Sequence, residues 1–137
     1  MKNVILIILL SWVAPLVTWS QMGAPIGNDL GTEALTEREY KGIFLGNKSL
    51  WNNGNTVVVV LPSSNSEGFE MVAEWALDAS GFEYQKHWLS LVFQGRSNAP
   101  VFLENEASVI KYVREHPGAI GILYSTAPPE ELELKVK

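Results

Sequence analysis

Residues 56–77, with the sequence TVVVVLPSSNSEGFEMVAEWAL, decide the fold class of this chain. They begin with five consecutive β-formers and Leu61, without alternation of apolar and polar residues, which is typical of a strand buried on both faces. Polar residues from Pro62 to Glu67 predict a loop that ends in helix-capping residues. Apolar side chains then recur at helical spacing through Leu77. Because a strand buried on both faces needs helices on both sides of its sheet, the stretch predicts an α/β fold.

Outward from this unit, the sequence predicts three more helices and two more strands. The helices, counted with the residues that begin and end them, cover 36–46, 82–95 and 104–118, and the strands cover 119–124 and 132–136. The first helix opens with a capping box, Thr36-Glu37-Arg38-Glu39. Trp51, in the turn-rich segment before the central strand, is expected to be a core anchor. The whole chain thus predicts about four helices around a mixed sheet of three to four strands.

Length and composition exclude several classes of protein function. The chain has 137 residues, which allows one ordinary domain. Its 10 basic and 15 acidic residues give a net charge of -5, so we expect no nucleic-acid partner. The absence of cysteine excludes a disulfide framework, a thiol nucleophile and a cysteine-based metal site.

Residues 1–20 have the pattern of a cleaved signal peptide. Lys2 precedes an apolar run from Val4 to Val17, and Thr18-Trp19-Ser20 provides small residues before a cleavage point. An uncleaved membrane anchor is the less favoured alternative, because a bilayer span needs about 20 apolar residues and Pro15 interrupts a shorter run. The mature protein is therefore expected to begin near Gln21 and to work in the periplasm.

Residues 21–35 are rich in Gly, Pro and Asn and show no apolar period. They are predicted to be an unstructured lead-in to a domain that covers residues 36–137.

The sequence contains no recognisable catalytic or cofactor motif. His87 lies inside a predicted helix and His116 at a helix end, and no HExxH, GxSxG, GxxxxGK[ST] or GxGxxG pattern is present. We therefore predict no enzymatic activity, no catalytic residue, no metal site and no cofactor, and we interpret both histidines as structural.

The best candidate for a binding site is the loop that leaves the central strand and enters a helix N-terminus. Exposed amides and the positive end of the helix dipole favour an oxyanion there, and hydroxyl groups add donors. Helix capping alone would explain the same residues, and Glu67 and Glu70 would oppose an incoming anion. Arg96 and Ser97 are expected to add a positive fork from a neighbouring loop, although a lone surface arginine needs no function. The candidate ligand-binding residues are Ser63, Ser64, Asn65, Ser66, Gly68, Arg96 and Ser97.

Four sequence blocks carry a family resemblance. They are Ile43 to Gly46, Trp51 to Gly54, the Tyr84-x3-Trp88-x2-Leu91-Val92-Phe93-Gln94-Gly95 block, and Tyr112-Val113-x3-Pro117-Gly118-Ala119-Ile120-Gly121. Over about residues 36–124 the chain resembles the phosphate-binding proteins of bacterial ABC transporters, more narrowly their short single-lobe members. The resemblance implies a three-layer single lobe of the type II periplasmic-binding-protein fold. It also implies a tetrahedral oxyanion such as phosphate as ligand, and an ABC permease or a sensor protein as partner.

The chain also departs from that family pattern. Ser66 and Gly68 match the family's serine-glycine helix start, but Pro62 and Ser64 stand where the family has an arginine and an acidic residue. Relatives have a strand before the first helix, where this chain has the segment 21–35. A missing strand would expose a sheet edge, so a homodimer through that edge is one hypothesis.

Two hypotheses for the function follow. The first is an exported solute-binding domain that takes phosphate or another oxyanion for an ABC transporter. The alternative is a degenerate, non-transport relative that acts as a periplasmic interaction or sensory module. A single lobe would hold its ligand on an open face, because two lobes are needed to enclose one.

Overall fold

The computed structural model describes residues 21–31 and 34–137. The predicted signal peptide lies outside the described residues. Among the described residues, no helix is both long enough and apolar enough to cross a membrane.

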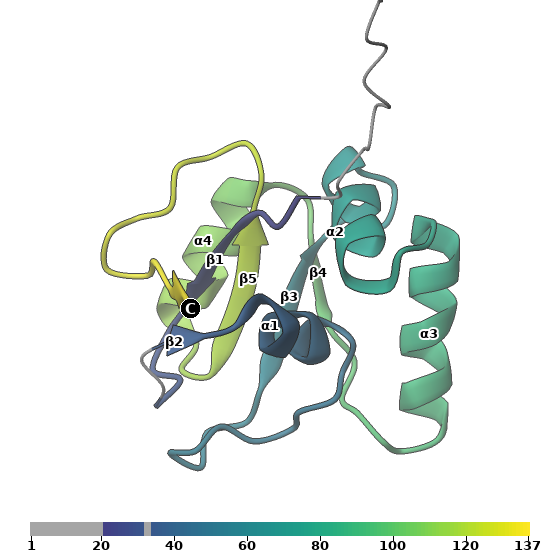
Figure 1. Ribbon diagram of the computed structural model, residues 1–137, viewed down its shortest axis with the longest axis horizontal. Coiled ribbons are helices and arrows are strands. Elements are labelled where there is room, and N and C mark those ends of the chain that lie inside the picture. Colours follow the sequence, from purple (N-terminus) through teal and green to yellow (C-terminus); the bar gives the residue numbers. More distant parts are fainter. Residues whose placement is uncertain (1–20, 32–33) are drawn as a thin grey trace, which may run out of the picture.

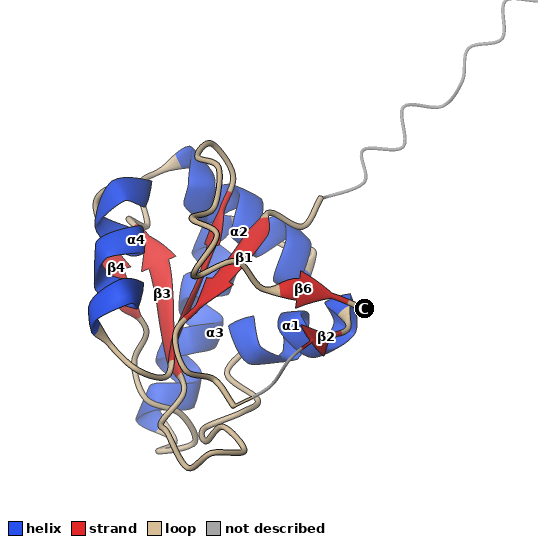
Figure 2. Ribbon diagram, turned by 90° about the vertical axis from the view of Figure 1, so that its left-hand side faces the viewer, coloured by secondary structure: helices blue, strands red, loops and turns tan. Residues whose placement is uncertain are grey.

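The described chain folds into a sheet with helices on both faces (Figure 1). The main sheet has the order β1-β5-β3-β4, in which β3 runs parallel to β4 and β5 while β1 is antiparallel to β5. A second sheet pairs β2 with β6, and Figure 2 shows these two short strands beside each other near the C-terminus. The strands are β1 (Ala24–Gly27), β2 (Ala34–Leu35), β3 (Val58–Pro62), β4 (Val101–Leu103), β5 (Ala119–Leu123) and β6 (Lys135–Val136). The helices are α1 (Glu37–Phe44), α2 (Glu67–Leu77), α3 (Gly81–Phe93) and α4 (Glu106–Glu115).

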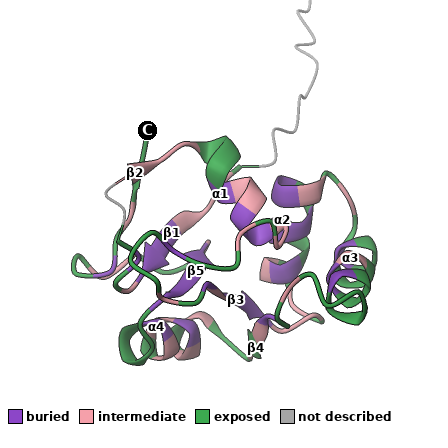
Figure 3. Cartoon of the chain, turned by 90° about the horizontal axis from the view of Figure 1, so that it is seen from below, coloured by how far each residue is buried: buried purple, intermediate pink, exposed green. Residues whose placement is uncertain are grey.

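The helices form two layers around the main sheet (Figure 3). Val59 and Leu61 of β3 pack into the larger core with side chains of α1, α2 and α3. Val60, whose side chain points to the opposite face, packs into the smaller core with Val109 and Val113 of α4. The strand predicted to be buried on both faces is therefore buried on both faces, and the predicted fold class, an α/β lobe with four helices and a mixed sheet, is confirmed.

Local sequence signals place the helices where they were expected. The capping box is present, because Thr36 Oγ1 accepts from the Glu39 amide at 3.1 Å and Glu39 Oε1 accepts from the Thr36 amide at 3.1 Å. Trp51 is the expected core anchor, since it is 3% exposed and its Nε1 donates to the carbonyl of Gly118 at 2.8 Å. This bond ties the segment before β3 to the segment before β5.

The prediction of an unstructured lead-in over residues 21–35 is wrong for residues 34–35, which form β2, and for residues 24–27. These residues form β1, which pairs with β5 and buries Ile26 completely. A segment of four residues that includes a proline and a glycine shows no hydrophobic period, so its sequence does not predict a strand. The strand is stabilised by its pairing with β5.

The edge that was expected to be exposed for a homodimer is covered by the chain itself. The Gly27 amide donates to the Leu132 carbonyl at 2.9 Å, and the Leu134 amide donates to the Pro25 carbonyl at 3.0 Å. The predicted edge strand over 132–136 is thus confirmed only in part, because just Lys135 and Val136 form a regular strand, and that strand pairs with β2. The strand β4 was not predicted, since three residues are too short for a periodic signal.

Two glycines with the same backbone conformation allow a matched test of this packing. Gly54 and Gly118 have φ of 87° and 89°. A Cβ at position 118 would lie 2.2 Å from the carbonyl oxygen of Thr56, whereas a Cβ at position 54 would have no neighbouring atom within 4 Å. Gly54→Ala should lower the free energy of unfolding by about 1–2 kcal/mol, the cost of the left-handed conformation. Gly118→Ala should lower it by about 4 kcal/mol or more, measured by urea unfolding followed through tryptophan fluorescence. Equal losses would mean that the close approach at Gly118 is not a constraint.

Candidate functional site

The candidate site lies at the carboxyl edge of the main sheet. Because β3 and β5 are parallel neighbours, the loop of residues 63–66 after β3 and the loop of residues 124–127 after β5 leave the sheet at this same edge. In open α/β sheets, ligands bind in the crevice outside the carboxyl ends of the strands. The position of the serine-rich loop is therefore the one expected of a binding site.

Ser66 is committed to local structure. It is the N-cap of α2, where its Oγ accepts from the Phe69 amide at 3.2 Å and donates to the Ser63 carbonyl at 2.6 Å. Within the described chain, no hydrogen bond engages the side chains of Ser64 or Asn65, and Asn65 is exposed. The loop thus separates into a capping residue and neighbours whose polar groups are available to a ligand.

Gly68 sits in the first turn of α2, beside this loop. A Cβ at this position would meet Pro62 Cγ at 3.4 Å, which is an ordinary contact. The absence of a side chain is therefore not required by packing, and it leaves the backbone of the first helical turn approachable.

The two acidic residues expected to oppose an anion have different surroundings. Glu70 Oε2 accepts from the Gly81 amide at 2.8 Å, so this carboxylate stabilises the start of α3. Glu67 remains exposed in the first turn of α2. Both carboxylates therefore keep a negative charge in the first turn of α2, although that of Glu70 is directed to the Gly81 amide.

A carboxylate of the chain already occupies the amides of the neighbouring loop. Glu106, at the start of α4, accepts from the amides of Tyr124 at 2.9 Å, Ser125 at 3.1 Å and Thr126 at 2.7 Å. Three consecutive backbone donors around one anion form a nest. Sequence reasoning missed this contact, because a glutamate in a first helical turn is ordinary and nothing local indicates a partner 18 residues away.

A hollow of about 430 Å³ borders this loop. Its walls are residues 21–24, Met71 of α2 and residues 123–127. The Tyr124 hydroxyl donates to the Gln21 carbonyl at 3.1 Å, and burial raises the pKa of Tyr124 to about 12. The phenol is therefore a neutral donor at physiological pH, which fixes the N-terminal segment against β5.

Arg96 and Ser97 do not join the serine-rich loop. They precede β4, whose first residue, Val101, pairs with Val60 in the middle of β3, so the chain before Val101 extends toward the amino edge of the sheet, away from Ser63. At about 3.3 Å per residue, the length of β3 alone separates the two edges by roughly 15 Å. The physical reason is that α3 returns the chain from the carboxyl edge to the amino edge before β4 begins.

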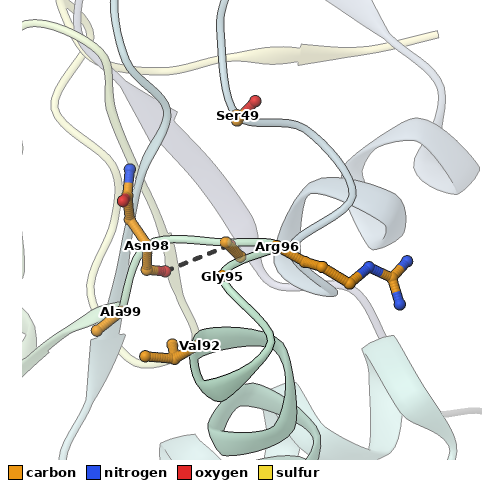
Figure 4. A pocket seen from close by; sticks show the side chains of 7 residues that line it. Ser49, Val92, Gly95, Arg96, Asn98 and Ala99 are labelled. Atoms are coloured by element: carbon orange, nitrogen blue, oxygen red, sulfur yellow. Dashed lines mark hydrogen bonds between the residues drawn. The ribbon is translucent and has the colours of Figure 1, made fainter.

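Arg96 and Ser97 instead line a separate open hollow of about 470 Å³ with Ser49, Val92, Gly95, Asn98 and Ala99. Figure 4 shows the Arg96 side chain directed away from Asn98 and Val92. Among the described residues, its guanidinium donates only to Gln94 Oε1, at 3.4 Å. The structure therefore brings together Ser63, Ser64, Asn65, Ser66 and Gly68, and leaves the predicted positive fork elsewhere.

The histidines make structural contacts. His87 Nε2 lies 2.7 Å from the Leu45 carbonyl oxygen, and His116 Nδ1 lies 2.8 Å from that of Tyr112, on whose ring it also stacks at 3.7 Å. In the described parts of the chain, no group of three or more His, Cys, Asp or Glu residues could hold a metal ion.

Comparison with known proteins shows the fold but no family. No protein-family model and no curated protein sequence matches the chain. Among solved structures, it is similar to an ABC-type phosphate transport receptor from Vibrio cholerae, with 14% identity and a TM-score of 0.50 over 82% of this chain and 45% of that one. A second similar structure is PstS from Borrelia burgdorferi, with 13% identity and a TM-score of 0.45 over 75% of this chain and 42% of that one. The chain thus has a periplasmic-binding-protein-like fold and spans less than half the length of these receptors.

The nest around Glu106 can be tested by removing its anion. Glu106→Ala leaves three backbone amides to water alone, so it should lower the free energy of unfolding by about 1.5–3 kcal/mol. Hydrogen exchange should also accelerate at the amides of residues 124–126. The matched control is Glu104→Ala, at an exposed position just before α4, which should change the stability by less than about 0.5 kcal/mol. If both variants lose the same stability, the carboxylate does not hold this loop.

Proposed function

We propose that the protein is an exported solute-binding domain that takes phosphate or a similar oxyanion at the N-terminus of α2. The observation that carries the proposal is the position of the loop 63–66, at the carboxyl edge of the sheet and directly before an 11-residue helix. The similarity of the fold to a phosphate transport receptor supports this choice of ligand.

The donors at this position suit a tetrahedral anion. In the first turn of α2, the amides of Glu67 and Gly68 have no hydrogen-bond partner among the described residues, whereas the Phe69 amide donates to Ser66 Oγ and the Glu70 amide to the Ser66 carbonyl. The side chains of Ser63, Ser64 and Asn65 add hydroxyl and amide donors. Gly68 leaves room for an oxygen to approach the backbone, and the helix dipole favours negative charge at this end.

The same geometry limits the affinity. Asn65 and Glu67 are exposed and the serines of the loop are only half-buried, so a ligand held by this lobe alone would lie on an open face where water competes for each hydrogen bond. Residues 63–68 include no arginine or lysine, and Glu67 adds an opposing charge. Binding is therefore expected to be weak unless another chain covers the site.

An interaction or sensory module is the second candidate. One observation favours it: Glu106 already fills the neighbouring nest of amides, so a second anion at this edge would meet a fixed negative charge. In this reading the fold is kept while the transport function is lost. The predicted signal peptide is compatible with both candidates, as is a permease or sensor partner in the periplasm.

Phosphate-dependent stability distinguishes the two. Thermal unfolding of the protein, expressed from its full-length sequence, is measured with phosphate or sulfate against chloride at equal ionic strength. A ligand at 100 times its Kd adds about 2.7 kcal/mol, which for a domain of this size raises Tm by roughly 10 °C. We expect phosphate to raise Tm with a saturable dependence on concentration. No shift for any oxyanion at tens of millimolar would favour the interaction module.

Two variants test where on the protein phosphate binds. Ser64→Ala removes a hydroxyl that no described residue uses, so it should weaken the phosphate effect several-fold without changing the stability of the free protein. Arg96→Ala, at the opposite edge of the sheet, should leave the phosphate effect unchanged. Loss of the effect in Arg96→Ala alone would move the site to the hollow at the amino edge.

A further inference from the structure

The helix α3 carries a second apolar stripe that faces solvent. Its inner stripe of Gly81, Tyr84, Trp88 and Leu91 is buried against the core. On its outer side, Phe82 is 68% exposed, Leu89 52% and Phe93 87%. Figures 1 and 3 both place α3 at the rim of the molecule, beyond β4. The two most exposed large apolar side chains of the described residues, Phe93 and Phe82, thus lie on one helix together with Leu89.

The outer stripe has the spacing of a helix-packing surface. Phe82, Gln85, Leu89 and Val92 follow intervals of three, four and three residues, which are the intervals of the inner stripe shifted by one position. One residue corresponds to about 100° around a helix, so the two stripes lie on adjacent sides of α3. The inner stripe packs on its own domain, and the outer one is spaced to pack on another helix in the same way.

The apolar surface continues from α3 onto β4. A small hollow of about 110 Å³ between them is lined by Gln85, Trp88, Leu89, Val92, Ala99, Pro100 and Phe102. Phe102 lies on the edge strand of the sheet and is 44% exposed. Strand addition at this edge is disfavoured, because β4 has only three residues and Pro100 precedes it. A partner at this surface would therefore pack against side chains and would not add a strand to the sheet.

We propose that a second copy of this chain covers this surface, with the two α3 helices antiparallel about a twofold axis near Leu89. The exposed fractions of Phe82, Phe93 and Phe102 together equal two whole phenylalanine side chains, or roughly 300–500 Å². Leu89 and Val92 enlarge this area. Since about 60% of a typical interface is apolar, the patch corresponds to roughly 800 Å² per partner, the size of a standard interface.

The helix dipoles also favour an antiparallel second copy. A twofold axis near Leu89 makes the two α3 helices run in opposite directions, which opposes their dipoles. A lipid surface fits less well, because it prefers an excess of basic residues, whereas Glu83 and Lys86 of α3 pair with each other.

Engineered cysteines test the axis directly, since the chain contains no cysteine of its own. In the full-length chain, Leu89→Cys places one thiol from each copy at the twofold axis and should form a disulfide-linked dimer under mild oxidation. The matched control is Leu50→Cys, at a position 58% exposed outside this surface. Cross-linking at position 89 should be at least ten times faster than at position 50. Equal rates would overturn the proposed axis.

Sedimentation equilibrium tests the rest of the proposal. The unmodified chain should dimerise with rising concentration, Phe93→Glu should be monomeric with an unchanged circular dichroism spectrum, and Leu50→Glu should dimerise normally. A monomer at all concentrations would overturn the proposal, whether or not anionic vesicles bind it.

Discussion

The burial of β3 on both faces is the constraint on which the rest of this structure depends. Val59 and Leu61 pack toward α1, α2 and α3, while Val60 packs toward α4. A strand with two apolar faces is stable only between two layers of helices, and its parallel neighbours then require helical crossovers. These crossovers determine which loops meet at each edge of the sheet. The carboxyl edge receives the serine-rich loop, and the amino edge receives Arg96.

The same arrangement explains why the candidate site is electrostatically incomplete. The N-terminus of α2 offers amides and hydroxyl groups, but the arginine that would add charge lies at the other end of β3. The neighbouring anion nest is filled by Glu106 from within the chain. A helix terminus that binds an oxyanion without a cationic side chain depends on backbone dipoles and neutral hydrogen-bond donors, which act weakly on an open face. An additional chain at the site would strengthen it by excluding water.

Signals that are local in sequence predicted the structure well, whereas contacts between distant segments did not appear. The capping box at Thr36, the helix starts at Ser66 and Asn105, and the two-sided burial of β3 follow from residues a few positions apart. The strand β1 was missed because Ile26 is held by β5, about 95 residues away, and by the segment after Pro129. For the candidate site, sequence reasoning predicted the serine-rich loop, which lies at the carboxyl edge of the sheet, but it placed Arg96 beside that loop. The position of Arg96 depends on the direction of α3, which runs from the carboxyl edge of the sheet back to the amino edge. No sequence motif indicates this direction.

The central claim is that an oxyanion binds at the N-terminus of α2. The most direct measurement is a titration of the isotopically labelled protein with phosphate, followed by the chemical shifts of its backbone amides. The account predicts saturable shifts that are largest for residues 64–69 and small for residues 124–126, whose amides are held by Glu106. Shifts confined to residues 95–98, or no saturable shift anywhere, would contradict it.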